Sequence, residues 1–99
     1  MKFVNIVEAR DLMERQLKSW RERSYADLVT RIGQSEHFEV TGPSGVRYQL
    51  EIQAVWDSRT GGDVRVLGSI DDGGWRAFVP PTDSFIKAPD GSFVGEDAV

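Results

Sequence analysis

The residues of this chain that could carry chemistry are aspartates at or near expected turns. They are Asp57, Asp63, Asp71, Asp72, Asp83 and Asp90. A divalent cation binds where several such carboxylate oxygens converge. Aspartate is also common in turns because its side chain hydrogen-bonds nearby backbone N–H groups, and D-D-G-G does not match a calcium-loop spacing. We therefore expect no metal and no cofactor.

Other signatures of catalysis are weak. His37 is the only histidine, and the chain has no cysteine, which excludes disulfides and thiolate metal sites. A histidine that acts as a general base needs a partner that orients its ring, and the sequence shows none beside His37. Because His37 alternates with Phe38 on the predicted strand, its side chain should point toward solvent. Gly61-Gly62 and Gly73-Gly74 match no phosphate-binding loop. We name no catalytic residue, and this favours a protein that is not an enzyme.

The N-terminal third has the apolar spacing of helices. A stripe at helical period predicts a helix over about 6–21, formed by Ile6, Ala9, Met13, Leu17 and Trp20. A short strand at the first seven residues stays open as an alternative. Ser24 and Asp27 form an S-x-x-D capping pattern, which predicts a second helix over about 24–33 with Gly33 as its left-handed C-cap.

The rest of the chain alternates with the period of strands. A first strand is expected over 36–41, and the long strand 46–56 carries apolar or aromatic residues at every even position. Leu50, Ile52 and Trp56 are therefore predicted core residues, as is Trp20. This pattern is typical of a sheet with one buried and one wet face.

A hairpin is expected around the Asp/Gly cluster at 71–74. Its predicted strands are about 64–70 and 75–79, and Pro80-Pro81 ends the second. Gly68 lies within the first strand, which indicates either a bulge or the close approach of a large side chain. Residues 84–95, with a Pro-Asp-Gly turn, are predicted as a small C-terminal hairpin or a packed loop.

Together these elements predict an α+β fold in one domain, residues 1–99. Two N-terminal helices would pack on one face of an antiparallel β-meander of about four strands at 36–80, followed by the small hairpin. The strands 46–56 and 64–70 should be adjacent and antiparallel, because their connection is too short for a crossover.

The charge distribution argues against nucleic-acid binding. The net charge is −4: residues 1–35 hold seven basic and five acidic side chains, and residues 36–99 hold five and eleven. An acidic sheet region cannot neutralise phosphates. No run approaches a membrane span, and the N-terminus lacks the apolar core of a signal peptide, so we expect a cytoplasmic protein without membrane contact.

Two stretches carry a family resemblance. G-S-I-D-D-G-G-W-R-A-F at 68–78 and T-D-S-F-I-K-A-P-D-G-S-F-V-G-E at 82–96 resemble a family of short uncharacterised bacterial proteins. Residues 24–28 and 48–57 are similar too, so the resemblance covers about 24–96 and omits the first helix. The family has a single proline followed by leucine where this chain has Pro80-Pro81. The resemblance supports one bacterial domain and implies no activity.

Two functions from different classes follow. The first is a non-enzymatic module that binds a protein partner, or a second copy of itself, through the sheet face opposite the helices. Its candidate surface consists of Arg47, Val55, Arg65, Leu67, Trp75, Arg76 and Phe78, apolar residues flanked by arginine. The segment 85–94 could instead fold back and bury this face, and Trp75 could simply pack across the hairpin. The second function is a small ligand-binding domain or enzyme that uses turn carboxylates and an arginine. Its residues would be Asp71, Asp72, Asp83 and Arg76.

Overall fold

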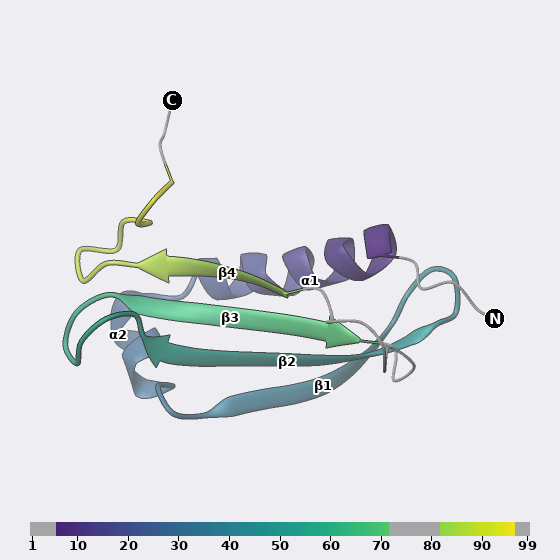
Figure 1. Ribbon diagram of the computed structural model, residues 1–99, viewed down its shortest axis with the longest axis horizontal. Helices are drawn as coiled ribbons and strands as arrows, with labels where there is room; N and C mark the ends of the chain where they lie inside the picture. Colours follow the sequence, from purple (N-terminus) through teal and green to yellow (C-terminus); the bar gives the residue numbers. More distant parts are fainter. Residues whose placement is uncertain (1–5, 72–81, 97–99) are drawn as a thin grey trace.

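The computed structural model describes residues 6–71 and 82–96. Two helices precede four strands, which form one antiparallel sheet in the order β1-β2-β3-β4 (Figure 1). The elements are α1 (Ile6–Arg21), α2 (Tyr25–Thr30), β1 (Ser35–Thr41), β2 (Arg47–Trp56), β3 (Val64–Asp71) and β4 (Thr82–Lys87). This is the predicted α+β class with an antiparallel meander, and β2 and β3 are adjacent and antiparallel as expected.

Helix α1 has the predicted bounds and a regular apolar stripe. Its buried side chains follow at intervals of four, four and three residues, Ala9, Met13, Leu17 and Trp20. This spacing keeps them on one side of the helix. On the exposed side Asp11 and Arg15 form an i,i+4 ion pair of 3.1 Å.

Helix α2 begins as predicted and ends earlier. The side chain of Ser24 accepts a 3.0 Å hydrogen bond from the Asp27 N–H, which caps the first turn. The prediction of Gly33 as the C-cap was wrong, because the helix ends at Thr30 and its C-cap is Arg31 in a right-handed conformation. Gly33 does take a positive φ of 84°, but its N–H donates to the Ala54 carbonyl and so joins the chain to β2.

Strand β2 has the predicted two faces. Tyr48, Leu50, Ile52 and Ala54 are buried, and the residues between them are exposed or half-buried. Trp56 at the strand end is half-buried and packs against the core. The register of the two neighbouring strands is continuous along β2, so every even position points to the same side.

The predicted hairpin had the wrong partner for β3. The fourth strand is β4, which pairs with β3 from Val64↔Lys87 to Ser69↔Thr82, while β2 occupies the other edge of β3. Residues 84–87 of β4 belong to the segment that the sequence predicts as the C-terminal hairpin or loop. The strand predicted over 75–79 lies outside the described residues. Beyond β4, the Val94 N–H donates to the Ile86 carbonyl, and Lys87 and Phe93 form an isolated bridge.

The described core combines buried side chains of both helices with buried side chains of β2, β3 and β4. Both helices lie behind the sheet in the view of Figure 1, and α1 contacts mainly β3 and β4. Of the two explanations for Gly68, a bulge or the close approach of a large side chain, the structure supports the second. Strand β3 has no bulge there, and a Cβ at Gly68 would lie 3.3 Å from Leu17. The glycine therefore makes room for the leucine. Neither described helix is long and apolar enough to cross a bilayer.

Candidate interaction surface

The sheet face opposite the buried core is the candidate site, and we call it the outer face. Register places its described residues in rows across the strands. They are Ser35, His37, Glu39 and Thr41 of β1; Arg47, Gln49, Glu51, Gln53 and Val55 of β2; Arg65, Leu67, Ser69 and Asp71 of β3; and Thr82, Ser84 and Ile86 of β4. All of them are exposed or half-buried. The outer face is thus distinct from the face that carries the core.

Three apolar side chains gather at one end of the outer face. Val55 and Ile86 flank Arg65 on the two neighbouring strands, and Leu67 lies two residues further along β3. All three are half-buried. We call Val55, Leu67 and Ile86 the apolar patch. Leu67 and Val55 were predicted for this surface, whereas Ile86 reaches it only because β4 pairs with β3.

Arg65 lies within the apolar patch, and its side chain is paired with groups on both sides instead of forming a free cation at the rim. Its Nε and a terminal nitrogen lie 2.9 and 2.8 Å from Oδ1 of Asp57, and its other terminal nitrogen donates to Oγ of Ser84 at 3.1 Å. The side chain therefore reaches from the end of β2 to β4. Its charge is already matched by the carboxylate of Asp57, so the patch is close to neutral.

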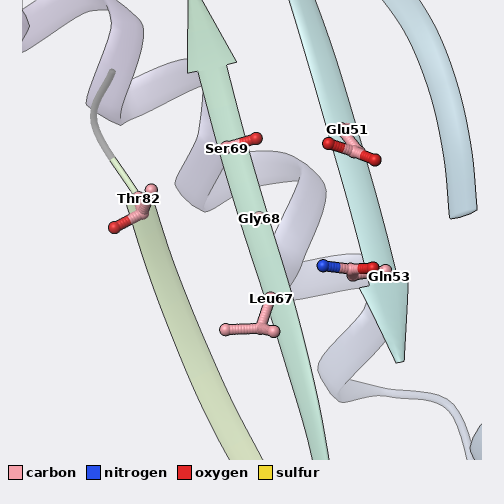
Figure 2. Close-up of a pocket in the computed structure, with 6 residues that line it drawn as sticks. All are labelled: Glu51, Gln53, Leu67, Gly68, Ser69 and Thr82. Atoms are coloured by element: carbon pink, nitrogen blue, oxygen red, sulfur yellow. The ribbon is translucent and has the colours of Figure 1, made fainter. Parts of the chain in front are cut away.

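A shallow hollow of about 230 Å³ adjoins the apolar patch (Figure 2). Its lining residues come from β2, β3 and β4, and they are Glu51, Gln53, Leu67, Gly68, Ser69 and Thr82. Hydroxyl, amide and carboxylate groups surround one aliphatic side chain there. These groups can donate and accept hydrogen bonds, but no nucleophile–base pair is assembled among them.

The other end of the outer face carries charges of both signs, because Arg47, Glu39 and Asp71 all lie there. Gln49 donates to the carboxylate of Glu39 at 3.1 Å, and Asp71 lies opposite Gln49 on β3. Nε2 of His37 is 3.3 Å from a Glu51 oxygen, and the histidine side chain is 68% exposed, as predicted from its position on the strand.

The structure brings together only part of the predicted surface. Val55, Arg65 and Leu67 are neighbours, whereas Arg47 lies opposite Thr41 at the far end of β2. Eight residues of strand separate Arg47 from Val55, which is roughly 27 Å. The other three predicted residues, Trp75, Arg76 and Phe78, lie outside the described residues.

The C-terminal segment lies mostly beside the core and not over the outer face. Phe85 is buried on the helix side, and the Phe93 ring meets it edge-on with centroids 5.9 Å apart. The Arg21 guanidinium stacks over Phe93 at 3.9 Å. The described residues of 85–94 therefore extend the sheet and cover the helix side, which differs from the fold-back that we considered.

The carboxylates of the alternative function do not converge where they are described. Asp71 lies on the outer face, whereas Asp83 shares the helix-side face of β4 with Phe85 and Lys87. The sheet separates the two groups. Asp72 and Arg76 fall outside the described ranges, and within 6–71 and 82–96 no three potential metal-ligating side chains cluster.

Two polar centres were missed by sequence reasoning. The ammonium of Lys87, buried at the sheet edge, donates to the carbonyls of Arg21 and Arg23 at 2.9 and 2.7 Å. The carboxylate of Glu8 accepts from Ser44 and Tyr48. Both are contacts between residues far apart in sequence, and both join α1 to the sheet region.

Comparison with known proteins adds no relative: no family model, curated protein or solved structure matches this sequence. The resemblance to a bacterial family therefore stays a prediction.

Proposed function

We propose that both helices cover the same face of the sheet, and that the protein is a small non-enzymatic module that binds another protein through the outer face. The observation that carries this proposal is the apolar patch, where Val55, Leu67 and Ile86 are half-buried around an arginine already neutralised by Asp57. The cores of protein interfaces combine apolar contact with few uncompensated charges. Its bacterial and cytoplasmic setting stays a prediction from the sequence.

The chemistry around the patch favours a protein over a nucleic acid. Neutral amide and hydroxyl groups border the patch, from Gln53, Ser69, Thr82 and Ser84. Toward the other end the face carries the carboxylates of Glu39 and Glu51. These carboxylates would repel phosphates, whereas the apolar side chains of a protein segment would match the patch.

Leu67→Glu tests this proposal. The immobilised protein is incubated with an extract of its source organism, and bound proteins are identified by mass spectrometry. We expect the wild type to retain a partner protein, and we expect the amount retained by Leu67→Glu to be at least tenfold lower. The matched control is Lys18→Glu, which changes charge at an exposed position of α1, outside the outer face, and should retain it. Circular dichroism and a thermal melt confirm that both variants are folded.

The retained protein is then purified and titrated into isotope-labelled protein. Amide shifts should be largest at residues of the outer face around Val55, Leu67 and Ile86. Shifts confined to α1 and α2, or equal retention by Leu67→Glu, would refute the proposal.

A further inference from the structure

We propose that a second copy of this chain docks on the outer edge of β1, so that two sheets join into one continuous antiparallel sheet. This interface is separate from the outer face and does not depend on the function proposed above. It rests on the free strand edge, on the short reach of the helix layer and on the order of charges along β1.

Strand β1 has an edge that is open for pairing. It contains seven residues in unbroken register with β2, and nothing within 6–71 and 82–96 pairs with its other side. Proteins commonly protect such edges with proline, lysine or a bulge. The sequence S-E-H-F-E-V-T has no proline or lysine, its register has no bulge, and its one inward-facing charge, Glu36, is already paired with Arg31. An extended segment can therefore add to it through backbone hydrogen bonds.

The helix layer does not fully cover β1. Every buried side chain of the sheet belongs to β2, β3 or β4, while Phe38 and Val40 on β1 are only half-buried. The third residue of that row, Glu36, is held by Arg31 at 2.8 Å. A neighbouring strand would shield Phe38 and Val40 further, which is favourable for apolar groups.

The side chains of β1 are complementary to a second β1 that runs antiparallel. A two-fold axis at Phe38, the midpoint of the strand, pairs all seven residues of each copy. It sets Phe38 opposite Phe38 of the second copy and His37 opposite Glu39 of the second copy. On the outer face the His37–Glu39 contact forms twice, and Ser35 faces Thr41. Aromatic pairs and hydroxyl pairs are cross-strand pairs that stabilise sheets, and so is His37 with Glu39 when the imidazole is protonated; the remaining pair in this register is Glu36 with Val40. An unrelated extended segment could form the backbone hydrogen bonds of the edge, but it would not repeat these side-chain pairs about a two-fold axis.

Cross-linking tests the register directly. The chain has no cysteine, so Phe38→Cys gives one thiol per copy. On the axis the two Cα atoms would be about 5 Å apart, within disulfide reach. Val40→Cys is the matched control, because the two residues would be four strand positions apart, roughly 13 Å. Under mild oxidation we expect a covalent dimer from Phe38→Cys and little from Val40→Cys. Equal cross-linking of both variants, or of neither, would overturn the proposal.

A charge exchange gives a second readout. In His37→Glu, two pairs of like charges face each other across the axis, and the dissociation constant of the dimer should rise about tenfold in sedimentation equilibrium. His37→Glu/Glu39→Lys places opposite charges at both pairs and should restore the dimer. Gln53→Glu, on the same face but away from the edge, should have little effect. Because His37 also neighbours Glu51, thermal melts verify that each variant is folded.

A wild type that stays monomeric at every concentration would also refute self-pairing. If it is monomeric while an unrelated extended peptide orders the amides of β1, the edge serves another partner and the proposal fails.

Discussion

The hydroxyl of buried Tyr48 donates a 2.7 Å hydrogen bond to Oε1 of Glu8 and so fixes the first turn of α1 to β2. The same carboxylate accepts from the Ser44 hydroxyl at 2.7 Å and from its N–H at 3.0 Å. Ser44, followed by Tyr48, lowers the pKa of Glu8 below its ordinary value, because these hydrogen bonds favour the ionised form. One side chain thus joins the helix, the strand and the turn between β1 and β2.

Glu8→Gln should make the protein less stable at neutral pH and less sensitive to acid. Because the pKa of Glu8 is lower in the folded chain, the unfolded chain binds more protons at pH values around and between the two pKa values. The contribution of Glu8 is therefore complete above the unfolded pKa of about 4.3 and is lost as the pH falls through the lower folded value. Urea denaturation between pH 7 and pH 2 measures this.

The difference in stability between Glu8→Gln and the wild type isolates the contribution of Glu8. The pKa values of Asp27, Asp90 and Glu96 are lowered as well, by hydrogen bonds from Arg23, Ser92 and Arg21 respectively. These groups are present in both proteins, so their acid sensitivity cancels in the difference. A stability gap between Glu8→Gln and the wild type that stays constant down to pH 2 would contradict the prediction.

Gly42→Ala should disturb the same cluster from the other side. A Cβ at Gly42 would lie 2.5 Å from Oε1 of Glu8, so the carboxylate must shift from its position between Ser44 and Tyr48. We expect a loss of stability in the wild type and a much smaller one in Glu8→Ala, where the clash is absent. A double-mutant cycle by denaturation measures this coupling. Equal losses in the two backgrounds would show that Gly42 acts through something other than Glu8.

Local patterns predicted the elements that bury a regular stripe. The bounds of α1, the capping of α2 by Ser24 and the buried face of β2 follow from spacing alone. The identity of β4 did not, because Asp83 and Lys87 occupy its helix-side positions and break the apolar alternation around Phe85. The D-D-G-G turn signal then favoured a nearer partner for β3.

The candidate surface depends on pairing as well as on pattern. Val55 and Leu67 point away from the core by alternation, which the sequence shows. Ile86 joins them, and Arg65 finds Asp57 and Ser84, only in the observed register. The observed register also places Asp71 and Asp83 on opposite faces of the sheet. Contacts between distant residues are not encoded in local periodicity, so they required the structure.

Gly68→Val should destabilise the protein through the contact with Leu17. Because a Cβ at Gly68 would lie 3.3 Å from the leucine side chain, the added methyl groups have no room. Overpacking of this kind costs about 1–3 kcal/mol of unfolding free energy. Leu17→Ala frees space, so Gly68→Val should cost clearly less in that background. Denaturation of the four proteins decides this, and additive losses would mean that Leu17 and Gly68 are not coupled.

Lys87→Met should loosen the end of α1. The Lys87 ammonium satisfies the carbonyl of Arg21, the last residue of α1, and the carbonyl of Arg23 just beyond it. The last carbonyls of a helix have no donor further along the helix. Methionine keeps the aliphatic length but cannot donate, so the loss should be about 1–3 kcal/mol, the cost of leaving buried polar groups unpaired.

Lys18→Met is the matched control for Lys87→Met. It removes the same charge from an exposed position on α1 and should stay within about 0.5 kcal/mol. Amide hydrogen exchange adds a local readout, since Lys87→Met should speed exchange in the last turn of α1 more than in β2. If both lysine variants lose the same stability, the effect is one of net charge, and the carbonyl contacts of Lys87 contribute little to holding the helix on the sheet.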